Sequence, residues 1–427
     1  MKAYKDLTKD ELLTLKAALE VEYKEMESKG LNLNMARGKP GLSQLELCMP
    51  MLDVMNSKSD MRTMLGNDTR NYGDLDGIGE CRRLMAYMLE VEKDNVLVGG
   101  NSSLNLMFDT VSRSFTHGVN GSTPWYKLDK VKFLCPVPGY DRHFRITEEF
   151  GIEMINIPLH DDGPDMDLVE QYVNNDPAVK GIWCVPKYSN PTGISYSDEV
   201  VLRFANLKPA AEDFRIYWDN AYGIHHLYED KQDKILNILE ECKKAGNPNM
   251  VYIFCSTSKI SFPGSGVSAV ASSIENIKYI MSHMTVQTIG HDKLNQMRHV
   301  MFFKNKAGVE AHMDKHAQIL KPKFEAVLNT LEQELGNLEI GTWIKPLGGY
   351  FVAFDTLEGC AKRVVALCKE AGVVMTPAGS TYPYMNDPRD TSIRIAPTLP
   401  SADELKKACE VFVLCVKLAS VEKLLAA

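Results

Sequence analysis

The chain has 427 residues, which is more than one ordinary hydrophobic core needs and is enough for two or three domains. Apolar residues make up 44% of it and charged residues 24%, which is the balance of a soluble globular protein. The net charge of -8 argues against nucleic acids and anionic membranes as partners, because clustered Lys and Arg drive binding to both.

Targeting signals and cysteine motifs are not evident. No stretch reaches the ~18 apolar residues of a membrane helix, and the opening MKAYKDLTKDELL has no apolar signal core. The ten Cys residues include no CxxC pair, and several lie in apolar runs such as FLCPV. We therefore expect a cytoplasmic protein whose cysteines are reduced and buried.

The first predicted elements are helical. Thr8 and Glu11 form a capping-box pattern, and apolar residues then recur at helical spacing to about Met26. An irregular Gly/Pro segment, NMARGKPGLS, follows this helix. From about residue 75 helices and strands alternate, with helices expected at 76–90, 102–116, 166–175 and 198–206.

The predicted strands are short apolar runs between or beyond these helices: VKFLCPV, IEMINIPL, VKGIWCVP, FRIYWDN, MVYIFCS and VSAVASS. Several of them are apolar nearly throughout, which is typical of strands buried on both faces of a mostly parallel sheet. A long helical region at about 291–335 then leads out of this part of the chain.

The remaining residues predict a small α+β domain. WIKP, GGYFVAFDT and TSIRIAP indicate strands, Cys360–Glu370 indicates a helix, and Ser401 with Glu404 indicates the capped start of a final helix. Because the two ends of a chain often meet, we expect the opening segment to pack with this domain. The expected division is a large domain at 51–304 and a small domain formed by 1–50 and 305–427.

Four short motifs stand at or near the ends of the predicted strands: SNPTG (Ser189–Gly193), DNAYG (Asp219–Gly223), STSK (Ser256–Lys259) and SIRIAP (Ser392–Pro397). Each has an ordinary structural explanation when taken singly: a turn for SNPTG, a cap or an ion-pair partner for Asp219, a solvated lysine for Lys259 and an outward-facing arginine for Arg394. Active sites in open α/β sheets gather at the carboxyl ends of strands. The joint occurrence of the motifs in this order therefore indicates an active site.

The order Asn, Asp-x-x-Tyr, Ser-x-Ser-Lys, Arg resembles the signature of aminotransferases that depend on pyridoxal 5'-phosphate (PLP) and have the aspartate aminotransferase fold. The resemblance covers nearly the whole chain, and ARGKP, NYGDLDG and TSKISFPGSGVS are similar to a bacterial subgroup of aspartate aminotransferase-like proteins. It implies an α/β protein with the PLP-dependent transferase fold, in which a large domain has a mostly parallel central sheet and a small domain is α+β. It also implies a homodimer in which Tyr72 reaches the cofactor phosphate across the interface.

The motif residues suit the chemistry of PLP. Lys259 can bind the aldehyde as a Schiff base and, once an amino acid displaces it, can move a proton. A carboxylate at Asp219 would keep the pyridine nitrogen protonated, so that the ring accepts an electron pair. Asn190 and Tyr222 can donate hydrogen bonds to the phenolic oxygen, and the planar fork of Arg394 matches the substrate's α-carboxylate. We predict that Lys259, Asp219 and Tyr222 are catalytic.

The phosphate of the cofactor needs donors. GGNSSLNLMF runs into a helix, whose first amides would point at an anion, and hydroxyls near Lys259 could add to them. The predicted phosphate-binding residues are Ser102, Ser103, Leu104, Ser256 and Ser258. Relatives usually carry an Arg a few residues after the lysine, but Gly266 stands about there in this chain. Another cation, or hydroxyls and amides, must then balance the phosphate.

One tyrosine, one histidine and a histidine pair complete the candidates. Tyr140 in CPVPGYDRH matches the family's aromatic residue that stacks on the cofactor ring, and its alternative is an ordinary turn tyrosine. His143 is hypothesised to support Asp219, as in some relatives, and its alternative is a surface or capping histidine. His312 and His316 are four residues apart on a predicted helix. With no third ligand evident, we expect a solvated helix face and no metal site.

Substrate choice depends on a second cation if the substrate is a dicarboxylate. In relatives the glycine that matches Gly38 lies beside the substrate, so Arg37 and Lys39 flank the site. We predict that Arg37 binds the distal carboxylate of aspartate or glutamate, with Arg142 as a second candidate. A surface arginine beside a turn is the alternative for Arg37.

The leading hypothesis is an aminotransferase that uses aspartate or glutamate with 2-oxoglutarate or oxaloacetate. A second hypothesis keeps PLP but changes the donor to alanine or an aromatic amino acid, or the outcome to that of a C–S lyase. A third is the ligand-sensing domain of a transcription regulator, which typically has a basic helix-turn-helix ahead of it. The roughly thirty residues before ARGKP are predicted to form one helix of mixed charge, which disfavours the regulator hypothesis.

Overall fold

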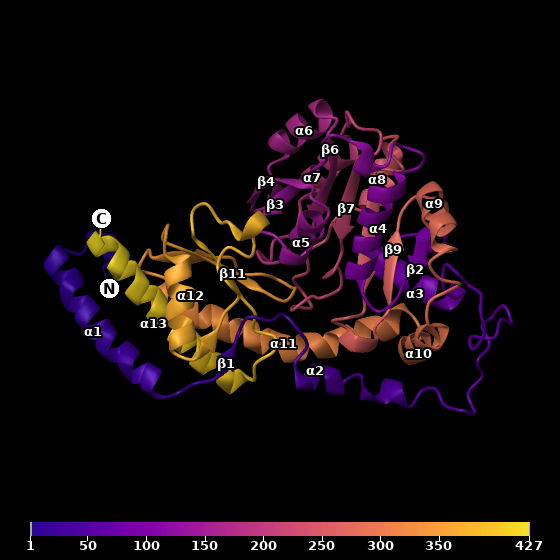
Figure 1. The fold of residues 1–427 in the computed structure, drawn as a ribbon. Coiled ribbons are helices and arrows are strands. Elements are labelled where there is room, and N and C mark those ends of the chain that lie inside the picture. The colour runs from indigo at the N-terminus through magenta and orange to yellow at the C-terminus, as the bar shows by residue number, and fades with distance from the viewer. Residues whose placement is uncertain (1, 427) are drawn as a thin grey trace.

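An eight-stranded sheet forms the centre of the larger part of the molecule (Figure 1). The structure is a computed structural model that describes residues 2–426, and the strand order is β2-β9-β8-β7-β6-β3-β4-β5. The strands from β8 to β4 run parallel, whereas β9 and β5 are antiparallel to their neighbours. The bounds are β2 (Val96–Val98), β3 (Lys132–Val137), β4 (Glu153–His160), β5 (Gly163–Pro164), β6 (Val179–Cys184), β7 (Arg215–Asp219), β8 (Val251–Ser256) and β9 (Ser268–Ala271).

The central strands are buried on both faces, as their nearly continuous apolar sequences predicted. In β6, Ile182 and Cys184 belong to one apolar cluster while Trp183 between them belongs to another. Helices α3, α6, α7, α8 and α10 contribute to the first cluster, and α4, α5 and α9 to the second. Their bounds are α3 (Gly79–Leu89), α4 (Ser103–His117), α5 (Asp141–Glu149), α6 (Met166–Asn175), α7 (Asp198–Ala205), α8 (Ile238–Lys244), α9 (Ile274–Met284) and α10 (Lys293–Phe303).

The smaller part of the molecule is built from both ends of the chain. Figure 1 shows α1 beside α13, and the two helices share an apolar cluster with α11, α12 and a three-stranded antiparallel sheet. The bounds are α1 (Lys9–Ser28), β1 (Leu33–Asn34), α2 (Leu42–Glu46), α11 (Lys306–Leu335), β10 (Gly341–Trp343), β11 (Val352–Thr356), α12 (Ala361–Glu370), β12 (Val373–Val374), β13 (Ser392–Ile395) and α13 (Ala402–Ala426). The domain limits 51–304, 1–50 and 305–427 stay a prediction.

Local signals in the sequence explain several helix ends. Thr8 and Glu11 form the expected capping box, with Thr8 N donating to Glu11 Oε2 at 2.7 Å. The long helical region contains a break, because Lys304 has a left-handed φ of 65° and Asn305 caps a new helix. None of the described helices combines the length and apolar character needed to cross a membrane.

Candidate active site

Residues of all four motifs meet at the carboxyl ends of neighbouring parallel strands. Asp219 is the last residue of β7, and Asn190 follows β6, its neighbour in the sheet. Lys259 comes three residues after the end of β8, the neighbour of β7 on the other side. Arg394 reaches the same place from β13 of the smaller sheet, where its Nη1 lies 3.2 Å from Asn190 Oδ1. The topology thus brings together the Arg394 guanidinium, the Lys259 amine, the Asp219 carboxylate and the Asn190 amide.

The Lys259 amine lies among aromatic rings and not in open solvent. Its Nζ is 5.1 Å from the centre of the Tyr222 ring and 5.8 Å from that of Tyr350. Burial lowers the pKa of Lys259, against an opposing effect of Asp219. A lysine with a lowered pKa holds more neutral amine at neutral pH, and the neutral amine is the nucleophile.

Asp219 is a buried carboxylate with two unlike oxygens. Its Oδ2 lies 3.0 Å from His143 Nε2, whereas Oδ1 is buried and has no hydrogen-bond partner within residues 2–426. His143 is itself buried and stacks on Trp183, with ring centres 4.6 Å apart, so the alternative of a surface histidine is wrong. A buried carboxylate oxygen without a partner is costly, and its arrangement suits a cationic N–H donor from a bound group.

Two tyrosines flank these groups. Tyr222 is buried, and burial raises its pKa well above the usual value, so its hydroxyl stays protonated and can donate a hydrogen bond. Tyr140 follows β3 and stands edge-on to His143, with ring centres 4.9 Å apart. Burial raises the pKa of Tyr140 as well.

Arg394 is a buried cation at the border between the two sheets. Its guanidinium lies 4.8 Å from the centre of the Phe351 ring, and Nη1 donates to Asn190 Oδ1 and to Asp141 Oδ1, each at 3.2 Å. Because Asn190 turns its oxygen toward Arg394, its amide nitrogen is left to donate elsewhere. The alternative of an outward-facing arginine is wrong, since the residue is 8% exposed.

The predicted phosphate-binding residues lie around the start of β9. Ser102 caps α4 and accepts from the Leu104 amide at 3.2 Å. Ser268 pairs with Ser256 in the sheet, and its carbonyl accepts from the Gly99 amide just before α4. Ser256 and Ser258 share a hydrogen bond between their hydroxyls. Ser268 therefore connects the segment before α4 to the end of β8, because it bonds to both.

The loop at Gly266 has little room for a side chain. A Cβ at this position would lie 3.0 Å from Thr257 Oγ1 and 3.4 Å from the Asn101 carbonyl. A cation approaches the loop from α10 instead, where Arg298 Nη2 donates to Ser265 Oγ at 2.6 Å. The sequence could not indicate this neighbour, because Arg298 lies 33 residues away in the chain.

The ARGKP segment lies against the ring beneath Arg394. A Cβ at Gly38 would lie 2.2 Å from the Phe351 ring, so only glycine allows this approach. Lys39 is tied to the smaller part through its carbonyl, which accepts from Thr398 Oγ1 at 3.0 Å. Arg37 and Arg142 are both exposed, and neither forms an ion pair within residues 2–426.

Tyr72 is one of five exposed apolar residues in two neighbouring segments, Met64, Leu65 and Tyr72 in the first and Val286 and Ile289 in the second, which we call together the exposed apolar surface. The two stretches of this surface adjoin each other, because Lys293 Nζ donates to the Gly73 carbonyl at 3.0 Å. Tyr72 is 81% exposed and Val286 is 93% exposed. An apolar surface of this kind is typical of a place where another chain packs.

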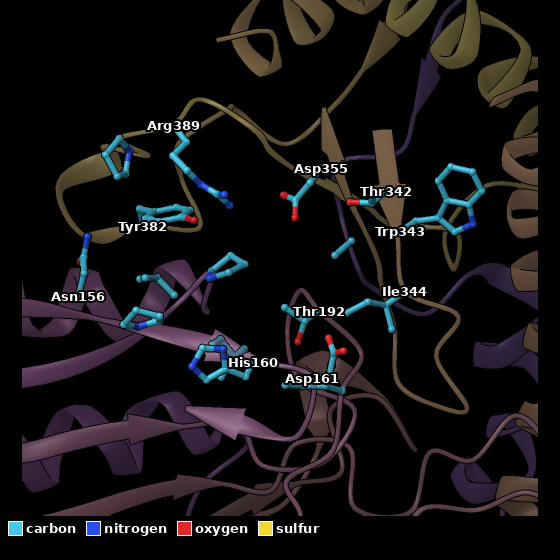
Figure 2. A pocket seen from close by; sticks show the side chains of 17 residues that line it. Asn156, His160, Asp161, Thr192, Thr342, Trp343, Ile344, Asp355, Tyr382 and Arg389 are labelled. Atoms are coloured by element: carbon cyan, nitrogen blue, oxygen red, sulfur yellow. The ribbon is translucent and has the colours of Figure 1, made fainter. Parts of the chain in front are cut away.

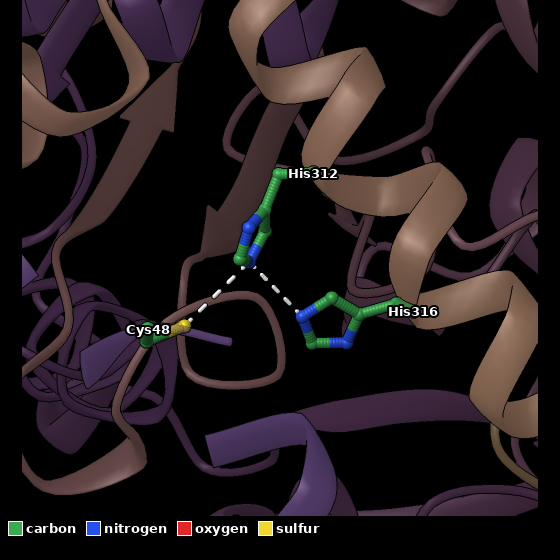
Figure 3. A group of neighbouring side chains, drawn as sticks. All are labelled: Cys48, His312 and His316. Atoms are coloured by element: carbon green, nitrogen blue, oxygen red, sulfur yellow. Dashed lines mark hydrogen bonds between the residues drawn. The ribbon is translucent and has the colours of Figure 1, made fainter. Parts of the chain in front are cut away.

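His312 and His316 form a buried cluster, so the expectation of a solvated helix face is wrong (Figure 3). Cys48 is the third neighbour that the sequence did not indicate: its Sγ lies 3.5 Å from His312 Nε2. His312 Nε2 is also 3.0 Å from His316 Nε2 and 2.8 Å from the Ile260 carbonyl. These are hydrogen-bond distances. The cluster therefore fits a hydrogen-bonded support beneath the segment that carries Lys259.

A cavity of about 730 Å³ opens between the two parts of the molecule (Figure 2). The ends of β3 and β4 and the segment at Thr192 line one side, and β10 and β11 line the other. Figure 2 shows Asp355 and Arg389 pointing into it from the smaller part, and burial raises the pKa of Asp355. Thr192 of the SNPTG motif lines this cavity, whereas Asn190, Asp219, Tyr222, Lys259 and Arg394 do not.

Comparison with known proteins extends over nearly the whole chain. The family described as "Aspartate amino-transferase" matches residues 7–427. A putative aminotransferase from Mycolicibacterium smegmatis is 45% identical over 99% of both chains. An aspartate aminotransferase from Corynebacterium glutamicum is 46% identical over 94% of this chain and 92% of its own length. A crystal structure of an aspartate transaminase from the same organism covers 99% of both chains, with a TM-score of 0.96 and 44% identity.

Proposed function

Because the chain belongs to the aspartate aminotransferase family and is an aminotransferase of that fold, we propose that it uses PLP to move the amino group of aspartate or glutamate to a 2-oxo acid. The observation that carries this proposal is the pairing of Lys259 with Asp219 at adjacent strand ends. The name of the Corynebacterium relative supports a dicarboxylate substrate. The proposed acceptors are 2-oxoglutarate and oxaloacetate.

The residues present fit PLP in three respects. Lys259 offers a part-buried amine with a lowered pKa for the aldehyde. Asp219 Oδ1 is a buried carboxylate oxygen with no hydrogen-bond partner among residues 2–426, as a protonated ring nitrogen requires. The amide of Ser103 and the hydroxyls of Ser102, Ser103, Ser256 and Ser258 would supply donors for a phosphate, and the Leu104 amide, which now donates to Ser102 Oγ, would have to exchange that acceptor for it. PLP, when bound, supplies an aldehyde that reacts with amines and a ring that accepts an electron pair.

The proposed mechanism assigns each step to a side chain. Asp219, oriented by His143, would hold a proton on the ring nitrogen. Lys259 would hold the cofactor through its amine, and the same amine would accept the proton from the substrate's Cα. Asn190 and Tyr222 would donate hydrogen bonds to the phenolic oxygen, and Tyr140 would cover one face of the ring. Arg394 binds and orients the α-carboxylate, which fixes the Cα–H bond for the transfer.

Arg37 is the proposed partner of the distal carboxylate. Gly38 packs on Phe351, which in turn lies under Arg394, so the ARGKP segment borders the proposed substrate position. Arg142 is the second candidate. An Arg37→Ala variant should raise KM for aspartate and glutamate while leaving KM for alanine unchanged. Equal effects on all three donors would instead indicate a structural role.

We further propose that the active unit is a homodimer, with Tyr72 of each chain reaching the phosphate in the other. The exposed apolar surface around Tyr72 supports this proposal. A cytoplasmic location is supported by the cysteines, all of which are unpaired and buried.

The direct test is an absorbance scan of the purified protein while amino acids are added one at a time. Aspartate and glutamate should convert the aldehyde form of the cofactor to its amine form, and 2-oxoglutarate should reverse the change. Pyruvate release without such interconversion would instead favour a lyase. Lys259→Ala should bind the cofactor without forming the covalent link and should lose turnover. Full turnover by that variant would refute the proposal.

A further inference from the structure

Asp141 contacts the cation that we assign to the substrate's α-carboxylate. It is the first residue of α5, and its Oδ1 lies 3.2 Å from Arg394 Nη1. The arginine side chain is 9% exposed and the aspartate side chain 31% exposed, so the pair meets solvent mainly on the Asp141 side. Because α5 packs on the large sheet and β13 belongs to the small one, this ion pair joins the two parts of the molecule.

The other contacts of Arg394 leave one edge of its guanidinium for a ligand. Nε faces Thr376 Oγ1 at 3.4 Å, and Nη1 faces Asn190 and Asp141. Nη2 donates to no group within the described residues 2–426. A carboxylate binds a guanidinium through two adjacent nitrogens, so the edge left for a ligand is formed by Nη2 and Nη1.

Two carboxylates cannot share Nη1 without cost. Nη1 carries two hydrogens, of which Asn190 accepts one and Asp141 the other. A substrate carboxylate on this edge needs a hydrogen of Nη1 that one of these two groups now accepts, and beside Asp141 it brings two negative charges together in a partly buried place. We propose that Asp141 occupies the α-carboxylate position on Arg394 in the empty site and is displaced by the substrate. This inference rests on the proposed function, which assigns Arg394 to that carboxylate.

Asp141 thereby sets the affinity for substrates and selects for those with a carboxylate. A substrate with a carboxylate gives Arg394 a new anionic partner in place of Asp141. An amine without a carboxylate displaces Asp141 without offering Arg394 another anion. The competition weakens substrate binding equally in the ground state and in the transition state, because the carboxylate stays bound to Arg394 in both. Its effect therefore falls on KM and not on kcat.

The test compares the wild-type holoenzyme with Asp141→Asn, which keeps the shape and one acceptor oxygen but removes the charge. We expect KM for aspartate and for 2-oxoglutarate to fall by about 3- to 10-fold, with kcat changed by less than about 2-fold. The dissociation constant of succinate, which has carboxylates but no amino group, should fall by a similar factor in calorimetry. Glu149→Gln, at the exposed end of the same helix, makes the same change in charge and should alter neither quantity.

An unchanged or raised KM and succinate dissociation constant in Asp141→Asn would overturn the inference. Asp141 would then be a bystander, or would hold Arg394 in place instead of competing for it. A failure of the proposed function looks different: the wild-type protein would transaminate no amino acid. In that case succinate binding to wild-type, Asp141→Asn and Arg394→Ala proteins still decides whether Asp141 competes for Arg394.

Discussion

The two oxygens of Asp219 illustrate how much of this site depends on single residues. One oxygen is held by His143, and the other is buried without a hydrogen-bond partner in the described part of the chain. If that oxygen holds the ring nitrogen, Asp219→Asn should lower kcat by about 10²- to 10³-fold, because a preorganised charge is lost. His143→Ala should lower kcat by only about 10- to 100-fold, because it removes an orienting contact and leaves the charge.

Steady-state kinetics of both variants, with cofactor absorbance recorded beside them, measure this difference. His117→Ala replaces an exposed histidine on α4 and serves as the control. If His143→Ala were as damaging as Asp219→Asn, His143 would have a direct part in the chemistry. If Asp219→Asn kept full kcat, the assignment of Asp219 would be wrong.

At the scale of elements, the segment that carries Lys259 is held from two sides. On one side, His299 of α10 lies 2.8 Å from Ser261 Oγ and 3.2 Å from Thr257 Oγ1. On the other side, His312 of α11 lies 2.8 Å from the Ile260 carbonyl. Both helices lie after the lysine in the chain, so neither contact follows from the local sequence around it.

The His299 contact gives a stability prediction. His299→Ala leaves the buried Ser261 hydroxyl with one partner fewer and creates a cavity, which should cost about 2–4 kcal/mol of unfolding free energy. Urea denaturation measures this loss, and kcat should fall as well because Lys259 is less firmly placed. An unchanged midpoint together with an unchanged kcat would show that α10 does not hold the segment.

The sequence predicts elements better than it predicts the contacts between them. The buried strands were evident because their sequences are apolar at nearly every position. In β6, for example, Ile182 and Trp183 are both apolar, and they pack in two apolar clusters on opposite faces of the sheet. The gathering of the motifs followed from the general rule that parallel strands end at one edge. The cluster of Cys48 with His312 was not foreseeable, since 264 residues separate the two side chains. The local periodicity of a sequence gives no information about contacts between residues so far apart in the chain.

At the scale of the whole molecule, buried histidines make stability depend on pH. Burial lowers the pKa of His226 and His299 to about 4 and that of His316 to about 3, from the ordinary 6.5. Between pH 6.5 and 4 the unfolded chain therefore binds more protons than the folded one, and the free energy of unfolding falls as the pH falls. Urea midpoints measured from pH 8 to pH 4.5 should decrease below pH 6.5. His299→Gln should make this decrease shallower, and a midpoint independent of pH would contradict the assignment of neutral rings.

The exposed apolar surface of Leu65, Tyr72 and Val286 leads to the last prediction, because the proposed phosphate contact of Tyr72 requires a second chain. Placing two charges there by Leu65→Lys with Val286→Lys should oppose burial of the surface and give a monomer in sedimentation velocity. That monomer should keep its thermal unfolding profile but lose cofactor affinity and most of its activity, since Tyr72 no longer reaches a partner. Val21→Lys, on the exposed face of α1, makes the same kind of change elsewhere and should leave the dimer intact. A wild-type protein that is monomeric and fully active would show that Tyr72 works within its own chain or not at all.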